Sequence, residues 1–268
     1  SAQDLDKTLG NVAHLIIEKV FDGRPIKEAC DYYKAEYETI FEESVNEKGL
    51  LLRLPEYAID LRRLKSKMQE ALDKLAETII NNGLTVYACE YEFKQAKWLD
   101  AGDNVSLGSR ADMLLSDTDG GKVIFDFKYS RGKSRRTEVE ENRALQLEVY
   151  RYMAKQEFGV ETNVRVAYVL LPDVTILTAD EIDPWQNEQN IIELKTERKD
   201  VNVMNEAANS YRMRWEQLKA GKIERVEGCD AGTGEYGEQE ANKGLFPLSE
   251  YKGVYSKDKF DKGYKNLK

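Results

Sequence analysis

The chain has 268 residues, of which 41% are hydrophobic and 33% charged, and its formal net charge is −9. This length allows one large domain or a core with an elaborated flank. The negative charge excludes a protein that coats nucleic acid through bulk positive charge, although a metal or a local basic segment can still attract phosphate. No run approaches the roughly 18 apolar residues of a membrane span, and residues 1–10 lack the features of a signal peptide.

The first third of the chain is predicted to be helical. Apolar residues recur at helical spacing over 5–21, 26–45 and 57–80, and Asn-Asn-Gly at 81–83 is typical of a helix end. The chain starts with Ser1 and not with Met. We therefore expect it to be part of a longer protein.

Strands are predicted next. Residues 84–93 form a β-rich run, and two further apolar segments, 107–116 and 122–130, flank the turn Asp-Thr-Asp-Gly-Gly. Apolar segments separated by such turn residues are typical of a β-hairpin.

Two aspartates are predicted to lie side by side across this hairpin. Asp112 and Asp126 are each seven residues from Asp119, the expected centre of the turn. Like charges in opposed positions repel unless something positive lies between them. Lys128 projects on the same face as Asp126 because side chains alternate along a strand. Two carboxylates and one ammonium on a single patch indicate the metal site and catalytic lysine of a metal-dependent nuclease.

The remainder alternates again between helix and strand. A helix is predicted over 138–158, followed by a buried strand over 164–171 and a short strand over 174–177 that pairs with it. Residues 187–220 are predicted to be mostly helical, with a break near 199–201. Helices followed by three strands, a helix and a strand predict an α/β fold, a mixed sheet with flanking helices.

Two further motifs complete a pattern. His14, the single histidine, lies on an early amphipathic helix, and Gln146 and Tyr150 occupy neighbouring places on one helix face. A lone histidine or a tyrosine at helical spacing is also typical of a packing residue. In this order, however, the histidine, Asp112, the Asp-x-Lys strand and the Gln-x-x-x-Tyr helix resemble the PD-(D/E)XK nuclease superfamily. Within it they resemble the nuclease domains of RecB and AddB helicase–nuclease subunits, over about residues 9–152.

The resemblance implies a restriction-endonuclease-like core with αβββαβ order and an added N-terminal helical region. Three parts are expected. Residues 1–83 form a helical region that carries the histidine and packs on the core. Residues 84–220 form the nuclease core with its following helices, and residues 221–268 form a weakly structured tail.

The resemblance also implies the roles of the site residues. The implied ligands of Mg²⁺ or Mn²⁺ are His14, Asp112, Asp126 and the backbone carbonyl of Phe127. Hard divalent cations prefer carboxylate and carbonyl oxygens. Lys128 is expected to position or activate the attacking water, and Gln146 and Tyr150 to orient the lysine or the DNA backbone. Glu90 is either an additional group near the metal or a structural residue.

The densest basic run covers residues 128–136 and begins on the expected catalytic lysine. Such a run is commonly a solvated surface, but its position favours contact with a polyanion. The candidate DNA-binding residues are Arg110, Arg131, Lys133, Arg135 and Arg136. Arg110 has the alternative of pairing with an acidic neighbour.

The chain departs from the family pattern at two points. Ser109 stands where the family's Gly-Arg-x-Asp-like turn has glycine. Some related nucleases hold an iron–sulfur cluster through an early cysteine and a late Cys-x-x-Cys cluster, whereas the late region here contains Cys229 alone. We therefore expect no iron–sulfur cluster and interpret Cys30 and Cys89 as small buried residues. Widely spaced cysteines also predict a cytoplasmic location.

The resulting hypothesis is a Mg²⁺- or Mn²⁺-dependent deoxyribonuclease of RecB/AddB type, with exonuclease action on strand ends that a helicase subunit delivers during double-strand break repair. A free-standing phage- or CRISPR-type nuclease of the same superfamily is one alternative. A nuclease-derived scaffold that only binds DNA or protein is another. A hydrolase of small phosphates is disfavoured by the basic run.

Overall fold

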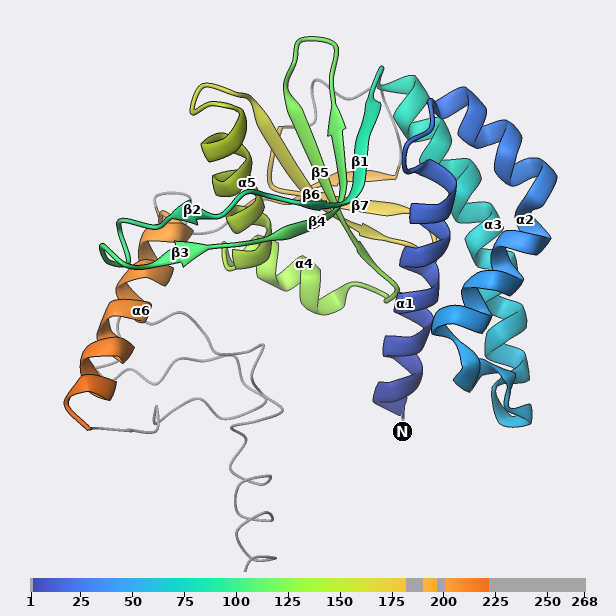
Figure 1. Ribbon diagram of the computed structural model, residues 1–268, viewed down its shortest axis with the longest axis horizontal. Helices are drawn as coiled ribbons and strands as arrows, with labels where there is room; N and C mark the ends of the chain where they lie inside the picture. Colours follow the sequence, from blue (N-terminus) through green and yellow to red (C-terminus); the bar gives the residue numbers. More distant parts are fainter. Residues whose placement is uncertain (1, 182–189, 197–200, 222–268) are drawn as a thin grey trace, which may run out of the picture. The chain divides into compact units, whose positions relative to one another are not determined.

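The computed structural model describes residues 2–181, 190–196 and 201–221 (Figure 1). The chain has a mixed α/β fold with an N-terminal helical region, as the sequence predicted. Its residues divide into two compact units. Among the described residues, the first unit contains 2–96, 106–181 and 190–196 and holds the large sheet, and the second contains 97–105 and 201–221. The expected divisions at residues 83 and 220 remain predictions, and residues 222–268 of the expected tail lie outside the described residues.

The three predicted N-terminal helices are present, with bounds within a few residues of those expected. They are α1 (Ala2–Phe21), α2 (Ile26–Lys48) and α3 (Ala58–Asn81). Two 3-10 turns, Leu50–Arg53 and Pro55–Tyr57, join α2 to α3. Figure 1 shows the three helices gathered on one side of the sheet, with α1 nearest to it.

The large sheet has six strands in the order β1-β4-β5-β6-β7-β8. The strands are β1 (Thr85–Glu92), β4 (Arg110–Ser116), β5 (Lys122–Lys128), β6 (Val164–Leu170), β7 (Thr175–Thr178) and β8 (Ile191–Glu193). The pairs β5–β6 and β7–β8 are parallel, and the other pairs are antiparallel. The sheet is therefore mixed, and β7 pairs with β6 as predicted.

The predicted hairpin register is confirmed. Met113 pairs with Phe125 and Ser116 with Lys122, which centres the turn on Asp119. The first strand is shorter than expected, because Gly108 and Ser109 separate β3 (Ser106–Leu107) from β4. The strand β3 pairs instead with β2 (Ala96–Lys97) in a two-stranded sheet.

Apolar side chains cover both faces of the sheet. One core packs α1, α2 and α3 against residues such as Phe125 and Val169, and a second packs α5 (Leu145–Phe158) against Ile124 and Tyr168. Successive residues of β5 thus alternate between the two cores, as the period of a strand requires. Residues with the parity of Ile124, among them Asp126 and Lys128, project toward α5.

The single helix expected over 138–158 is in fact two helices, α4 (Lys133–Glu140) and α5. The prediction was wrong because Asn142 adopts a positive φ of 52° between them, which no continuous helix permits. The Arg143 N–H donates to the Glu138 carbonyl across this turn. The break lets α5 take its own direction along the sheet.

The helix predicted over 187–220 is also corrected. Residues 187–189 and 197–200 lie outside the described residues, but Ile191–Glu193 form a strand that pairs with β7. Within the described part of this range only α6 (Val203–Lys219) is helical, and its N-cap is Asn202, whose side chain accepts a hydrogen bond from the Asn205 N–H. The β-branched pair Ile191-Ile192 favours a strand once a sheet edge is available.

The second unit contains α6 and the segment 97–105. The rings of Trp98 and Tyr211 contact each other with centroids 6.4 Å apart. No helix among the described residues is long and apolar enough to span a membrane.

Gly132, directly before α4, has a φ of +74°, and a Cβ there would lie 2.2 Å from Leu170 Cδ1. We predict that Gly132→Ala lowers the free energy of unfolding by about 2 kcal/mol, because the alanine is strained in a left-handed conformation and must displace a buried leucine. Gly10→Ala is the matched control, since nothing lies within 4 Å of its Cβ inside α1. It should raise stability by about 0.5–1 kcal/mol. Urea titrations of both variants measure the difference, and equal effects would contradict the prediction.

Candidate metal and catalytic site

The candidate site lies at the carboxyl end of β5, where the β4–β5 ladder stops. The last paired residues are Met113 and Phe125, so Asp112 and Asp126 form the next opposed pair. Asp112 Oδ2 accepts a hydrogen bond from the Phe127 N–H at 2.7 Å. The Asp112 carboxylate thus takes the place of a backbone carbonyl of β4 as the hydrogen-bond acceptor of this amide. The two predicted carboxylates are therefore neighbours at the point where the strands part.

Asp126 belongs to a closed ring of four polar side chains from β5 and α5. The Tyr150 hydroxyl donates to Asp126 Oδ1 at 3.0 Å and accepts from Gln146 Nε2 at 2.8 Å. Lys128 Nζ donates to Gln146 Oε1 at 3.3 Å and lies 2.6 Å from Asp126 Oδ2. Asp126 is 1% exposed, so its charge depends on this compensation. The Asp-x-Lys strand and the Gln-x-x-x-Tyr helix therefore meet in space.

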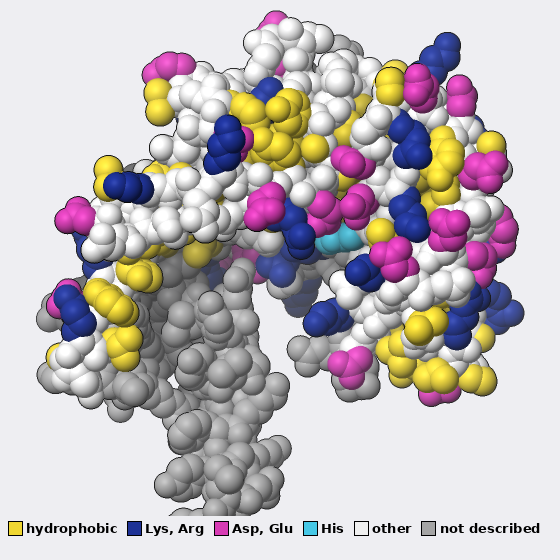
Figure 2. Space-filling model, in the orientation of Figure 1, with side chains coloured by type: hydrophobic (Ala, Val, Ile, Leu, Met, Phe, Trp, Pro, Cys, Tyr) yellow, Lys and Arg dark blue, Asp and Glu magenta, His cyan; other side chains and the backbone are white. Residues whose placement is uncertain are grey.

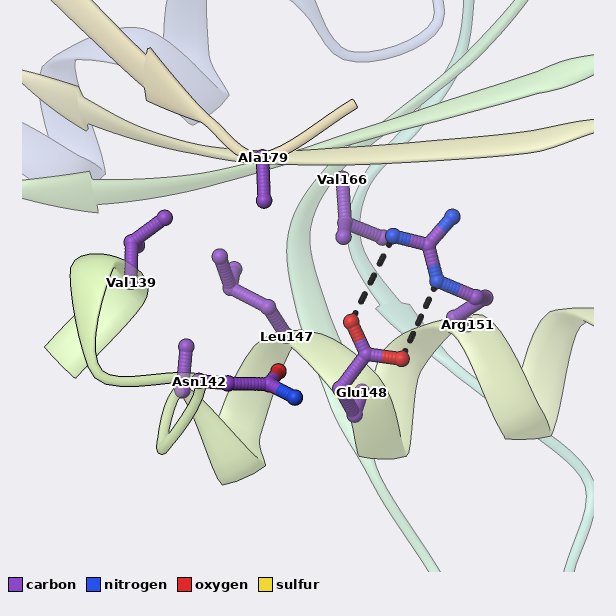
Figure 3. Close-up of a pocket in the computed structure, with 8 residues that line it drawn as sticks. Val139, Asn142, Leu147, Glu148, Arg151, Val166 and Ala179 are labelled. Atoms are coloured by element: carbon purple, nitrogen blue, oxygen red, sulfur yellow. Dashed lines mark hydrogen bonds and ion pairs between the residues drawn. The ribbon is translucent and has the colours of Figure 1, made fainter. Parts of the chain in front are cut away.

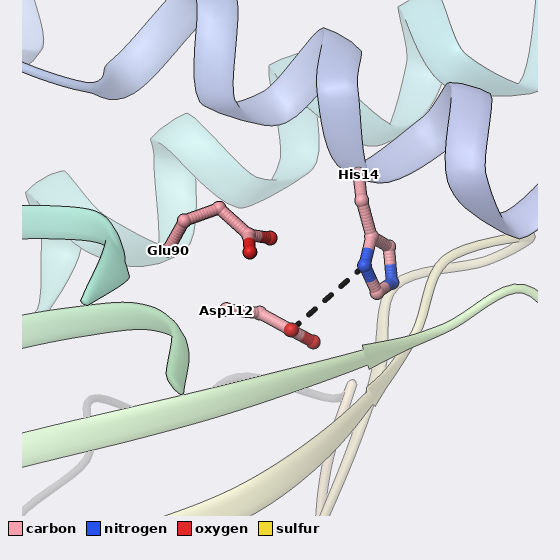
Figure 4. Close-up of side chains that lie close together, drawn as sticks. All are labelled: His14, Glu90 and Asp112. Carbon is pink, nitrogen blue, oxygen red and sulfur yellow. Dashed lines mark ion pairs between the residues drawn. The ribbon is translucent and has the colours of Figure 1, made fainter. Parts of the chain in front are cut away.

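His14 reaches the same strand end from α1. Its Nε2 lies 2.9 Å from the Phe127 carbonyl oxygen, which can only accept, so Nε2 carries the hydrogen. In the neutral ring Nδ1 then keeps its lone pair, and it lies 3.8 Å from Asp112 Oδ1. Figure 4 shows Nδ1 turned toward Asp112. A hydrogen bond from the remote nitrogen to a carbonyl is the usual way in which a ligating histidine is oriented.

Glu90 completes a compact group of donors. It lies between Cys89 and Tyr91, which pair with Met113 and Ala111, and therefore stands opposite Asp112 on β4. Ligand atoms of His14, Glu90 and Asp112 all lie within 4.8 Å of one another (Figure 4).

The backbone at Glu90 is strained, with a φ of +48° in the middle of a strand. Such a conformation costs about 1–3 kcal/mol and persists where the surrounding structure imposes it. Sequence reasoning could not choose between a metal-related and a structural role for Glu90. The alternation of a regular strand does not reveal a residue turned by a local left-handed conformation.

Burial and the proximity of acidic groups change the pKa values of two residues in the site. Burial, and to a smaller extent the charge of Asp126, raises the pKa of Asp112 from 3.8 to about 6, while His14, the Phe127 amide and Lys128 act in the opposite direction. Burial and the charges of Asp126 and Asp112 also raise the pKa of Tyr150. The tyrosine therefore stays a hydrogen-bond donor to Asp126. A carboxylate held above its ordinary pKa marks a candidate functional site.

The five candidate DNA-binding residues differ in their surroundings. Arg131 and Lys133 are exposed, and Arg136 is half-buried. Arg110 is 65% exposed, and its Nε lies 3.0 Å from Glu90 Oε2. Of the two roles considered for Arg110, this contact corresponds to pairing with an acidic neighbour. Both Glu138 oxygens accept hydrogen bonds of 2.9 Å from Arg135 Nη1.

Neither of the two described cysteines belongs to the group of donors, although Cys89 directly precedes Glu90 on β1. Cys89 is buried and Cys30 half-buried, both as free thiols, and burial raises the pKa of each. Cys229 lies outside the described residues.

The donor set fits a divalent cation. Carboxylates and a carbonyl are the ligands of Mg²⁺ and Mn²⁺, and an imidazole is compatible with a transition metal such as Mn²⁺. Asp126 Oδ2 is buried and accepts no well-oriented hydrogen bond from any described residue, although the Lys128 ammonium is close. Figure 2 shows His14, in cyan, at the surface among acidic side chains with basic ones nearby. The site is therefore open to solvent and substrate on one side.

A separate small pocket lies between the α4–α5 turn and the sheet (Figure 3). It is lined by Val139, Leu147 and Val166, with the ion pair of Arg151 and Glu148 at its side. Arg151 also lies 2.8 Å from Asp180, whose other oxygen accepts the Val166 N–H. These contacts anchor α5, with its Gln146 and Tyr150, to the sheet.

Comparison with known proteins gives a family. Residues 1–232 match the PD-(D/E)XK nuclease superfamily. The match covers well over half of the chain, so the chain belongs to this superfamily, whose members are generally metal-dependent nucleases that use Mg²⁺ or similar cations. No curated protein matches the chain.

The raised pKa of Asp112 predicts a pH-dependent affinity for metal. As the pH falls through about 6, Asp112 takes up a proton that a cation must displace, so Mn²⁺ affinity should fall by up to about tenfold per pH unit. Calorimetry at pH 5 to 8 tests this, with proton release increasing toward low pH. A flat profile across this range would contradict the assignment.

The same shift predicts a gain in stability for Asp112→Asn. A folded-state pKa above the ordinary value means that the metal-free protein loses stability as the pH rises from about 4 to 6. The uncharged variant avoids this loss and should unfold with about 1–3 kcal/mol more free energy at pH 7.5 in a chelator. Urea titration measures the difference, and an unchanged or lower stability would disagree with it.

Single removal of the other donors should weaken metal binding. His14→Ala and Glu90→Gln are each expected to raise the Kd for Mn²⁺ at least tenfold, because the first removes a ligand nitrogen and the second removes the negative charge of a ligand carboxylate. Glu77→Gln, an exposed acid on α3, is the control and should leave the Kd unchanged. Wild-type affinity in the His14→Ala variant would remove the histidine from the ligand set.

Proposed function

We propose that the chain is a DNA nuclease that hydrolyses phosphodiester bonds with Mg²⁺ or Mn²⁺. The observation that carries this proposal is the convergence of the His14–Glu90–Asp112 donors with the Asp126–Lys128 pair at one strand end. The family membership supports the class of reaction. Asp126 and the Phe127 carbonyl are proposed to share in holding the cation.

The side chains of the ring have separate tasks in this proposal. When bound, the divalent cation lowers the pKa of a water and shields phosphate charge. Lys128, with three donor hydrogens, orients the attacking water and stabilises the charge that develops on the phosphate. Tyr150 and Gln146 hold Asp126 and Lys128 in fixed rotamers through their hydrogen bonds. This preorganisation is what a phosphoryl transfer requires.

The DNA is proposed to approach over the loop that follows β5. Arg131 on this loop and Lys133 at the start of α4 are exposed, and Arg136 on α4 is half-buried. Because the chain carries a net charge of −9, binding rests on this local segment and on the cation and not on the overall field. Contacts of lysine and arginine side chains with phosphate do not read the base sequence, so this mode of DNA binding has no sequence preference.

The wider context follows the resemblance to RecB and AddB. The N-terminal helix with its histidine, the hairpin carboxylates and the Gln-x-x-x-Tyr helix converge on one site, which is the combination that suggested this type. We propose exonuclease action on DNA ends that a helicase subunit supplies in double-strand break repair, in the cytoplasm. The acidic charge suits a domain whose DNA affinity comes mainly from a partner motor.

The central test uses end-labelled linear and circular DNA. Wild-type protein is expected to degrade linear DNA only with Mg²⁺ or Mn²⁺ and to spare closed circles. Asp126→Asn and Lys128→Gln should each lower kcat at least 100-fold, because each breaks the ring that surrounds the Asp126 carboxylate. Lys67→Gln, which changes a partly exposed lysine on α3, is the control for Lys128→Gln.

The outcomes separate the alternatives. Cleavage of circles identifies an endonuclease and contradicts the exonuclease assignment. Unchanged cleavage by either pure variant contradicts the catalytic roles. Wild-type protein that binds DNA but leaves every substrate intact in both metals contradicts the nuclease proposal and favours a scaffold.

A further inference from the structure

Tyr168 on β6 is fully buried beside the catalytic strand. It is the register partner of Asp126 across the parallel β5–β6 ladder. The Lys128 ammonium lies 5.7 Å from the centroid of its ring, within the range of a cation–π contact. The ring is thus a further contact of the lysine, in addition to Asp126 and Gln146.

The same ring carries a second cation. Arg135 Cζ lies 5.4 Å from the Tyr168 centroid, and both Glu138 oxygens accept from Arg135 Nη1 at 2.9 Å. Glu138 Oε2 also accepts from the Tyr168 hydroxyl at 3.1 Å. Glu138 therefore fixes the position of the tyrosine ring and of the guanidinium together.

These contacts distinguish Arg135 from its basic neighbours. Its side chain is 26% exposed, whereas Arg131 and Lys133 are exposed on the same segment. Burial would lower the pKa of Arg135, but Glu138, and more weakly Asp126, raise it, so the guanidinium stays charged. A residue held in this way would have to leave its carboxylate partner before it could grip phosphate.

We propose that Tyr168, held by the Arg135–Glu138 pair, positions the Lys128 ammonium against Asp126, and that Arg135 acts through this unit and not as a DNA contact. The inference rests on the proposed nuclease function and adds positioning residues to it. Lysine has four rotatable bonds, and an ammonium with contacts on several sides keeps one rotamer. Misplacement of a catalytic group by about 1 Å can cost 100-fold in rate.

The ring and the hydroxyl of Tyr168 can be tested separately. Tyr168→Leu removes the aromatic face and is expected to lower kcat about tenfold or more. Tyr168→Phe keeps the face and its contact with Arg135 but loses the hydrogen bond to Glu138, so it should retain more of kcat than Tyr168→Leu. DNA affinity, measured by fluorescence anisotropy with Ca²⁺ in place of Mg²⁺, should stay unchanged in both. Equal kcat for the leucine and wild-type proteins would overturn the inference.

Glu138→Gln separates positioning from DNA binding without changing a fully buried residue. If Glu138 serves positioning, kcat falls about tenfold while the Kd for DNA is unchanged. If Arg135 is a DNA contact restrained by Glu138, its release tightens DNA binding, and this outcome would overturn the inference. Glu70→Gln is the matched control, because Lys67 and Glu70 form an ion pair of the same i,i+3 spacing on α3. It should change neither quantity.

Arg135→Lys and Arg131→Gln complete the comparison. Arg135→Lys keeps the charge but loses the planar guanidinium, and it should recover part of the kcat that Arg135→Gln loses, at unchanged Kd. Arg131→Gln is expected to show the opposite pattern, a weaker Kd with a smaller salt dependence. A raised Kd at full kcat for Arg135→Gln would overturn the inference. Failure of wild-type protein to cleave would instead contradict the proposed function itself.

Discussion

The repulsion between Asp112 and Asp126 is the constraint on which the site depends. Their strands bring the two carboxylates together where the β4–β5 ladder ends, and Asp126 is almost completely buried. The protein offsets this cost with the Lys128 ammonium, the Tyr150 hydroxyl and the Phe127 amide. Each of these groups stabilises one of the two carboxylate charges. An apolar residue in either position would need no such compensation. Charge retained at such a cost is typical of functional sites.

The arrangement of layers explains how remote segments supply this site. Helix α1 packs on one face of the sheet and α5 on the other, and β5 ends between them. His14 reaches the Phe127 carbonyl from the first face, and Tyr150 reaches Asp126 from the second. Side chains from both faces of the sheet therefore meet at the end of β5. In the middle of a sheet, side chains from the two faces could not meet in this way. The added helical region is part of the site and not an appendage to it.

A strained residue and an anchored helix both lie next to the site. Glu90 adopts a left-handed conformation on the edge strand β1, next to Asp112 and His14. On the opposite side, Arg151 and Asp180 anchor the helix that carries Tyr150. Rigid support of this kind allows a strained or charged group to persist in one arrangement. The gain in unfolding free energy that we expect for Asp112→Asn is an example of stability that is given up for function.

Local patterns in the sequence determined the three N-terminal helices, the hairpin and its register, because a strong turn and strict alternation leave only one pairing. They also placed Asp126 and Lys128 on one face. Tertiary packing alone decided that Glu90 turns toward His14, that the ring of Tyr168 contacts Arg135 and Lys128, and that residues 138–158 break at Asn142. These features depend on positive φ angles and on contacts between residues distant in the chain. Neither leaves a periodic trace in the sequence, which is why only the folded structure reveals them.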